Sequence, residues 1–280
     1  MEQKGSSLLD EVEKYAASET LNLPIFPGVA RELYAKIADE NCSVTDIAAT
    51  IAKDQAMAGQ MLKLANSAFF AGLNKVRTVK ESIMRLGVRQ VYNCLVAGSQ
   101  KNLYVSRDPV IAKHLGVLWQ HALVTARGTQ WLLRKTGYSQ EADEGFLAGL
   151  FHDIGKLLLL KVFETMRAER KEVSLSESFL LEILDFMHVE QGYALTTGWS
   201  MPEVYCEVVK RHHEEEIDGA DPLLMAVRIV DRVCAKSGPS LKPDPAISPA
   251  ILPEVMAMSV KEIVLAELEV LIEDTVEQEG

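Results

Sequence analysis

The sequence predicts an all-α fold, and three observations support that fold class. Apolar residues recur at helical spacing in long segments, pairs of hydroxyl and acidic residues mark helix starts, and no long alternation of period two predicts a strand. The two clearest apolar stripes are Phe179, Leu180, Ile183, Leu184 and Met187, and Ile263, Val264, Leu268, Leu271 and Ile272.

Four predicted helices begin at capping boxes. In a capping box, a hydroxyl side chain accepts a hydrogen bond from the amide three residues later, and an acidic side chain there reaches back. The pairs that fit this pattern are Ser43 with Asp46 (a shortened version), Thr78 with Glu81, Ser174 with Glu177, and Ser259 with Glu262. We therefore expect helices to start at these four places.

Proline residues and a change in charge predict the boundaries between parts of the chain. Pro24 and Pro27 precede the first long helical block, and Pro109 follows a basic region. Five prolines between Pro239 and Pro253 predict an irregular loop before the last helix. These breaks predict four parts: an N-terminal segment over 1–20, helical parts over 21–110 and 111–236, and a proline-rich loop with a final helix over 237–280.

Composition excludes several classes of protein. Of the 280 residues, 48% are hydrophobic and 25% are charged, which is typical of a globular chain rather than a disordered one. The longest apolar stretches, such as Leu157–Leu160, are far shorter than the roughly 20 residues that cross a bilayer, and the N-terminus lacks an apolar signal core. The four cysteines are scattered, without a Cys-x-x-Cys pair. We therefore expect a cytoplasmic protein with reduced thiols and no membrane partner.

The net charge of −11 is unevenly distributed. Residues 1–110 carry 13 basic and 12 acidic side chains, whereas residues 111–280 carry 16 and 28. Because an acidic surface repels a phosphate backbone, nucleic acid is not an expected partner. The basic segment Lys75–Lys101 leaves nucleic-acid binding open as an alternative, although a solvated helix face explains the same pattern.

Residues that suit metal chemistry concentrate in the second half of the chain. They are His121, His152, Asp153, His188, His212, His213 and Asp231. Neutral imidazoles and carboxylates are the ligands that borderline divalent metals prefer. Asp153 and Asp231 both lie in apolar runs, where a carboxylate is costly unless it is paired or bound to metal. A single histidine on an apolar face is more often a hydrogen-bonded core residue, but the combination with Gly155-Lys156 favours one shared site.

The spacing of these residues refines the hypothesis. His152 and Asp153 are neighbours, and neighbours on a helix project about 100° apart, so they can flank one cation. The two oxygens of a carboxylate such as Asp153 can bridge two cations. His114 precedes His121 by seven residues, or about 10 Å along a helix, which is too far to share a metal. We therefore expect His114 to be structural or exposed.

Two sets of motifs point to a known family. The N-terminal set is Leu23-Pro24 with Pro27, Asp54-Gln55-Ala56-Met57, Leu62-Lys63-Leu64-Ala65-Asn66-Ser67-Ala68, and Ile83-Met84-Arg85-Leu86-Gly87. The C-terminal set adds His152-Asp153, then Gly192, Trp199 and Pro202 after His188, and His212-His213. With these motifs, the chain resembles the HDOD domain, an HD-related output domain of bacterial signalling proteins, within the HD metal-dependent phosphohydrolase superfamily. The resemblance covers roughly residues 20–235.

The resemblance implies a fold, a metal site and candidate catalytic residues. An N-terminal helical bundle would pack on a C-terminal HD-type helical domain. The positions that match the ligands are His121, His152, Asp153 and Asp231 for one metal ion, and His188, His212 and His213, with Asp153 shared, for a second. Lys156 would face a substrate phosphate, so Asp153 and Lys156 are the candidate catalytic residues. The implied cofactor is one or two divalent ions, from among Fe, Mn, Ni, Zn and Mg.

Two departures narrow the activity that the resemblance implies. After His212-His213, the chain lacks the Gly-Tyr-Pro signature of the related HD-GYP phosphodiesterases, so cleavage of cyclic di-guanylate is not expected. Val117 stands where some of those enzymes carry a glutamate for a third metal, so a trinuclear centre is not expected either.

The expected function is therefore that of a regulatory module. On this interpretation, the chain is an output unit of bacterial signal transduction whose partners are other signalling proteins. The alternative is an active metal-dependent phosphohydrolase that acts on a nucleotide or another phosphate ester. The complete ligand set and Lys156 favour that alternative.

Overall fold

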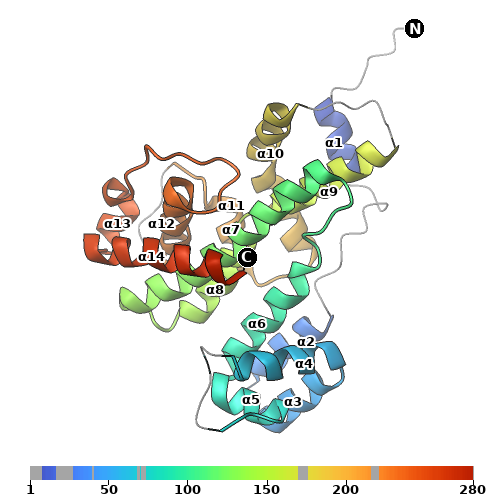
Figure 1. The fold of residues 1–280 in the computed structure, drawn as a ribbon, viewed down its shortest axis with the longest axis vertical. Coiled ribbons are helices and arrows are strands. Elements are labelled where there is room, and N and C mark those ends of the chain that lie inside the picture. The colour runs from blue at the N-terminus through green and yellow to red at the C-terminus, as the bar shows by residue number, and fades with distance from the viewer. Residues whose placement is uncertain are drawn as a thin grey trace. The chain divides into compact units, whose positions relative to one another are not determined.

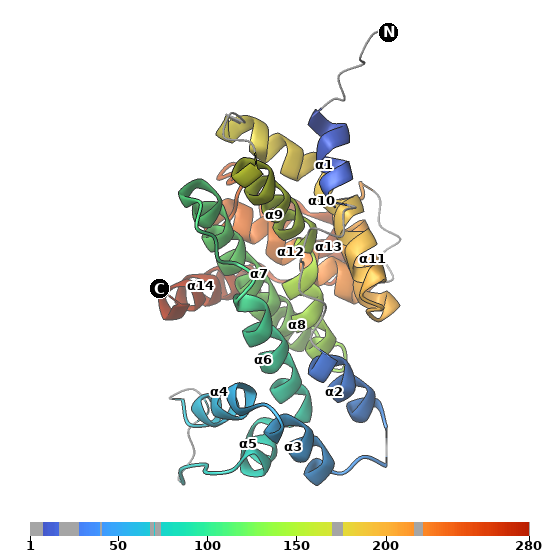
Figure 2. The ribbon, with the colours of Figure 1, turned by 90° about the vertical axis from the view of Figure 1, so that its right-hand side faces the viewer.

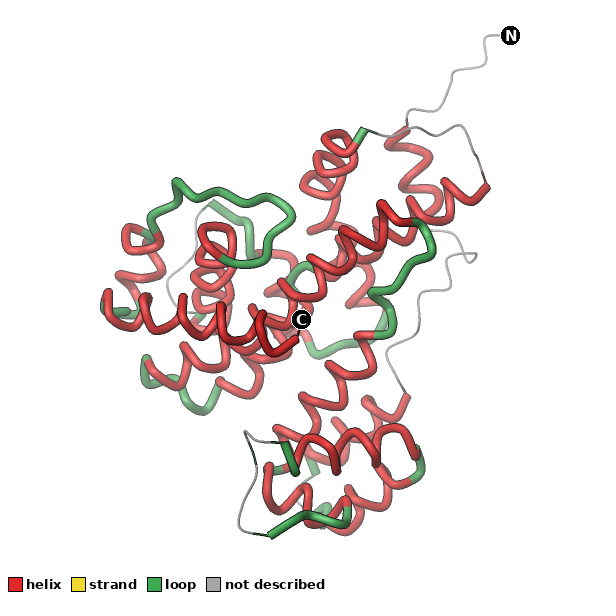
Figure 3. Tube along the Cα trace, in the orientation of Figure 1, coloured by secondary structure: helices red, strands yellow, loops and turns green. Residues whose placement is uncertain are grey.

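The computed structural model describes residues 8–16, 28–39, 41–67, 70, 74–169, 176–215 and 221–279. In these ranges, all regular structure is α-helical apart from one short 3-10 turn, and no strand is present (Figure 3). The predicted all-α fold class is therefore confirmed. No helix in the described ranges combines the length and the apolar character that crossing a membrane requires.

The helices divide into two compact units. The first unit contains α1 and α7 to α14, and the second contains α2 to α6 (Figure 1). The second unit corresponds to Pro24–Leu103, which holds most of the N-terminal motifs described above. All seven candidate metal ligands lie in the first unit.

The second unit consists of five short helices. They are α2 (Gly28–Ala38), α3 (Val44–Ala52), α4 (Gln55–Ala65), α5 (Val79–Leu86) and α6 (Val88–Lys101). Capping boxes at Ser43 and Thr78 start α3 and α5, as the sequence predicts. Gly87 adopts φ 81°, a left-handed conformation that suits glycine, and it separates α5 from α6.

Asn66 fixes the connection between α4 and α5. Its Nδ2 donates to the carbonyl of Val76 at 2.9 Å, and its Oδ1 accepts from the amide of the same residue at 2.9 Å. A second bond joins its Nδ2 to the carbonyl of Leu62 at 2.8 Å. This asparagine of the N-terminal motifs therefore ties the loop to the end of α4, and the described atoms give it a structural role.

The first unit is built around one long helix. Its helices are α1 (Leu8–Ala16), α7 (Pro109–Lys135), α8 (Ala142–Phe151), α9 (Ile154–Glu169), α10 (Glu177–Gly198), α11 (Glu203–Arg211), α12 (Pro222–Ser237), α13 (Pro253–Ala257) and α14 (Glu262–Glu279), with a 3-10 turn η1 at Pro249–Ile251. α7 packs against α8, α9, α12 and α14, while α9 packs against α10 (Figure 2). The buried face of α7, which includes Leu115, Leu118 and Ala122, forms part of the core.

Two of the four predicted helix starts, those at Ser174 and Ser259, are not found as capping boxes among the described residues. The prediction at Ser259 is wrong, because Ser259 has φ 52° and its amide donates to the carbonyl of Met256. An N-cap residue takes an extended conformation instead, and α14 begins only at Glu262. Ser174 lies outside the described residues, and α10 is capped by Ser176, whose Oγ accepts from the amide of Phe179.

The proline-rich stretch is partly helical. Residues 238–248 form the irregular loop that was predicted, but η1 and α13 follow it before the last helix. Pro249 and Pro253 occupy the first positions of these two short helices. A proline is tolerated there because the amide it lacks would have no partner within the helix.

Candidate metal centre

Five segments of the first unit bring the predicted ligands together. α7 carries His121, α10 carries His188, and α12 carries Asp231, while His212 and His213 follow the end of α11. His152 and Asp153 occupy the two-residue break between α8 and α9. Lys156 lies in the first turn of α9, one turn beyond that break. The seven predicted ligands therefore converge on one place, as the sequence interpretation required.

The ligand atoms form two groups. One group is Asp153, His188, His212 and His213, and the other is His121, His152 and Asp231, with one donor atom from each residue inside 4.8 Å of the others in its group. His213 is exposed and Asp231 is partly exposed, while the other five residues are buried. The arrangement therefore has a buried interior and an accessible side.

Main-chain carbonyls fix the orientation of four of the imidazoles. The Nδ1 atoms of His121, His152, His188 and His212 lie 2.9, 2.8, 2.8 and 2.8 Å from the carbonyl oxygens of Pro239, Gly149, Leu184 and Val209, respectively. Because a carbonyl only accepts, each Nδ1 carries the hydrogen. In the neutral ring, Nε2 then presents a lone pair, which is the form that ligates a metal.

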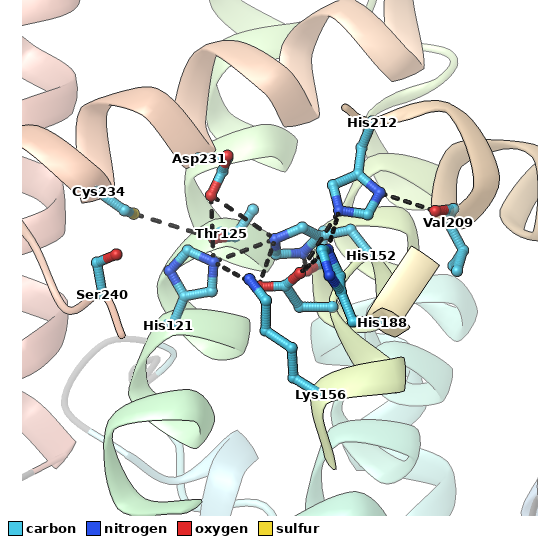
Figure 4. Close-up of polar contacts among 12 residues, drawn as sticks. His121, Thr125, His152, Lys156, His188, Val209, His212, Asp231, Cys234 and Ser240 are labelled. Carbon is cyan, nitrogen blue, oxygen red and sulfur yellow. Dashed lines mark hydrogen bonds and ion pairs between the residues drawn. The ribbon is translucent and has the colours of Figure 1, made fainter. Parts of the chain in front are cut away.

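The Nε2 atoms point at one another and at a carboxylate. Those of His121 and His152 are 3.1 Å apart, and those of His188 and His212 are 3.3 Å apart (Figure 4). Oδ2 of Asp153 lies 3.4 Å from Nε2 of His121, and Oδ1 lies 3.4 Å from Nε2 of His188. Oδ1 is buried and has no hydrogen-bond partner in the described part of the chain. Imidazole nitrogens that face one another and an unpartnered carboxylate oxygen fit a cation between them, so these residues suit a divalent metal.

Lys156 and the two carboxylates shift one another's pKa values. Burial alone would raise the pKa of Asp153, but Lys156 and the surrounding imidazoles outweigh it and hold that pKa well below its ordinary value. The pKa of Asp231 is likewise lowered, because bonding to His121 outweighs burial. Burial disfavours the charged form of Lys156, yet Asp153 and Asp231 raise its pKa. Both carboxylates are therefore ionised and available as ligands at neutral pH.

The pKa values of the histidines shift in different directions. Burial lowers the pKa of His152 to about 3 and that of His188 to about 4. Burial also acts against protonation of His121, but bonding to Asp153 and Asp231 outweighs it and raises its pKa well above the ordinary value. His152 and His188 are therefore neutral at physiological pH, as a metal ligand must be.

A cavity of about 410 Å³ opens onto the ligands. It is lined by His121, Asp153, Lys156, Asp231 and, farther out, by α10 and the loop after α12. Nζ of Lys156 is 2.7 Å from Oδ2 of Asp153, so this cation lies beside the candidate ligands (Figure 4). The volume falls within the range of ordinary small-molecule sites.

His114 lies apart from both groups of ligands. It is buried, its Nδ1 donates to the carbonyl of Val110 at 2.8 Å, and its Nε2 is 3.3 Å from Oε1 of Glu177. This agrees with the structural role that its spacing from His121 predicts.

The structure adds a partly buried ion pair that the sequence did not predict. Nε of Arg228 is 2.5 Å from Oε1 of Glu254, and Nη1 donates to the carbonyls of His212 and Glu214. Arg228 thus holds the turn that presents His212 and His213. The sequence offers one signal for this pair, a single arginine in the apolar run from Leu223 to Val230. The partner cannot be found from local spacing, because it is 26 positions away.

Comparison with known proteins gives a family match and one relative. The model of the HDOD domain family matches residues 23–215. A protein of Treponema pallidum (strain Nichols), named only as uncharacterized, is 25% identical over 197 residues, which are 69% of this chain and 38% of that protein. The chain therefore spans well under two thirds of that relative's length.

Solved structures share the fold. A Shewanella amazonensis SB2B protein provisionally named a metal-dependent phosphohydrolase has a TM-score of 0.74 at 18% identity, over 96% of this chain and 97% of its own. An HDOD domain protein of unknown function from Geobacter sulfurreducens has a TM-score of 0.72 at 18% identity, over 95% and 96%. A Marinobacter aquaeolei VT8 protein provisionally named a signal transduction protein has a TM-score of 0.68 at 20% identity, over 96% and 62%. At such identities, the similarity concerns the fold alone.

Proposed function

Since this chain belongs to the HDOD family, we propose that it is an output module of bacterial signal transduction that contains a divalent metal centre. One observation carries the metal centre. Nε2 atoms of four imidazoles and both oxygens of Asp153 converge in a buried space, where Nζ of Lys156 lies 2.7 Å from Oδ2 of Asp153. Divalent cations would balance these groups and connect the helices that carry them.

The residues would divide between two cations. His121, His152 and Asp231 would hold one, and His188, His212 and His213 the other, with Asp153 between the groups. When bound, such cations stabilise negative charge and lower the pKa of bound water. The protein's own contribution is orientation, because main-chain carbonyls fix four of the five imidazoles before a metal arrives.

The metal content of the purified full-length protein tests this proposal. After loading with Mn, Fe, Ni or Zn and desalting, elemental mass spectrometry should find one or two equivalents. Asp153→Asn should reduce the metal content of both groups of ligands, because the two groups share this carboxylate. His114→Gln is the matched control, since His114 is a buried histidine of α7 outside both groups. Wild-type protein that retains no metal, or an unchanged content in Asp153→Asn, would contradict the proposal.

A second candidate function is metal-dependent phosphohydrolysis. The cavity beside the ligands favours it, because Lys156 lines that cavity and its ammonium would neutralise charge on a phosphate ester. A panel of nucleotides and phosphodiesters with Mn²⁺ or Ni²⁺ distinguishes the two candidates. Turnover that Asp153→Ala abolishes in a folded, stable protein would favour the hydrolase. Metal-loaded protein without turnover across the panel would favour the output module.

A further inference from the structure

An ion pair spans the outer part of the cavity. Nζ of Lys242, in the loop after α12, lies 2.6 Å from Oδ2 of Asp185 on α10. Both side chains line the cavity that also contains Asp153 and Lys156. They are 78% and 48% exposed, so water and small solutes reach the pair. Exposed ion pairs of this kind are weak, and their partners exchange readily.

The backbone that carries Lys242 is anchored in the first unit, whereas its side chain is held by the exposed pair with Asp185. The carbonyl of Pro239 accepts from Nδ1 of His121 at 2.9 Å, and the amide of Asp244 donates to the carbonyl of Ala235 at 2.7 Å. The four-carbon stem of the lysine extends from this fixed base. Lys242 can therefore change its partner without a rearrangement of the loop.

The charges that line the cavity explain why such an exchange would matter. The basic side chains are Lys156, Arg232 and Lys242, and the acidic ones are Asp153, Asp185, Asp231 and Asp244. Two of the acidic groups, Asp153 and Asp231, are candidate metal ligands. With cations bound there, the cavity would carry net positive charge and attract a small anion. Asp185 is the carboxylate that already occupies Lys242, and it would compete with that anion.

We propose that Asp185 competes with a bound oxyanion for Lys242. The cavity takes phosphate, free or as the end of an ester, and binding transfers the Lys242 ammonium from Asp185 to the ligand. The inference rests on the proposed metal centre. Substitutions of Asp185 and of Lys242 should therefore change the affinity for phosphate in opposite directions. Removal of Asp185 frees the ammonium, whereas removal of Lys242 eliminates it. If the ion pair served the fold alone, both substitutions would act in the same direction.

Calorimetric titration with inorganic phosphate tests this prediction. Metal-loaded full-length wild type, Asp185→Asn and Lys242→Gln are compared at low ionic strength, after their metal contents are measured. We expect the Kd for phosphate to fall about two- to fivefold in Asp185→Asn and to rise by a similar factor in Lys242→Gln. Both shifts should shrink in high salt. Glu267→Gln breaks the exposed pair with Lys135, which does not line the cavity, and should leave the Kd unchanged.

The outcomes separate this inference from the metal proposal. Variants that hold wild-type amounts of metal but shift the Kd in the same direction, or not at all, would overturn the role of the ion pair and leave the metal centre intact. Metal-loaded wild type and Asp185→Asn that both fail to bind phosphate would overturn it as well. A wild-type protein without metal would overturn the proposed metal centre and this inference together.

Discussion

At the residue scale, the two oxygens of Asp153 face different groups of imidazoles. Oδ2 lies beside Nε2 of His121, whereas Oδ1 lies beside those of His188 and His212, at 3.4 and 3.5 Å. Nζ of Lys156 lies 2.7 Å from Oδ2, whereas Oδ1 is buried and has no hydrogen-bond partner among the described residues. One residue thus links both halves of the centre.

Arg228 should affect metal binding only by holding the turn that carries His212 and His213. Arg228→Met leaves Glu254 buried without its cation, so this single variant should lose about 3–5 kcal/mol of unfolding free energy. In Arg228→Met/Glu254→Met, both charges are gone, and stability should largely return. The turn at His212 nevertheless lacks its donor, so the double variant should hold less metal in the group of His188, His212 and His213. A stable double variant with full metal content would contradict this role.

The stability of the metal-free protein should fall as the pH falls below 6.5. The folded-state pKa values of His152 and His188, about 3 and about 4, lie below the ordinary value of 6.5. Between those values, the unfolded chain binds protons that the folded chain does not, so acidification favours unfolding. At pH 5, the loss should be about 1–2 kcal/mol for each histidine. The raised pKa of His121 acts in the opposite sense only above pH 6.5.

Urea unfolding after chelation checks this pH dependence. The midpoint should be lower at pH 5 than at pH 6.5, and the difference should shrink in His188→Gln, which lacks one of the histidines whose pKa is lowered. A midpoint that is constant or rises on acidification would show that these histidines are not held neutral in the folded protein.

At the scale of elements, α9 and α10 cross where a side chain would not fit. A Cβ atom added to Gly155 would lie 1.9 Å from the carbonyl oxygen of His188 and 2.8 Å from the amide nitrogen of Gly192. Because these are backbone atoms, the helices would have to separate. Gly155→Ala should therefore destabilise the protein by about 1–3 kcal/mol.

Gly116→Ala is the matched control for this crossing. Gly116 is also helical, but a Cβ atom there would have no neighbour within 4 Å, so alanine should be neutral or stabilise by about 0.5–1 kcal/mol. Equal effects of the two substitutions in thermal unfolding would show that the close contact of α9 and α10 does not limit stability.

Helices and their caps can be predicted from the sequence, whereas contacts between residues far apart in the chain cannot. The helices and the caps at Ser43 and Thr78 were predictable, because residues three or four apart encode them. The start at Ser259 was misread, since a backbone conformation overrode a valid local pattern. The candidate ligands can be proposed from their family positions, but the pair Lys242–Asp185 joins residues 57 positions apart, and no periodicity encodes such contacts.

At the scale of the whole molecule, the candidate ligands all belong to one of the two compact units. A ligand that binds only the folded form stabilises the unit it binds, by about 2.7 kcal/mol at a hundredfold excess over its Kd. Metal should therefore slow amide hydrogen exchange in α7 and α12 but not in α3 to α6. Mass-spectrometric exchange with and without metal measures both units at once, and equal slowing in both would contradict independent units.

Anomalous diffraction from crystals grown with Mn²⁺ tests the metal centre most directly. The account predicts an anomalous peak within about 2.3 Å of Nε2 of both His121 and His152 and of a carboxylate oxygen of Asp231. A second peak is predicted beside Nε2 of His188 and His212. Data without a peak at either place, in which the imidazoles keep the mutual distances described here, would contradict the metal centre.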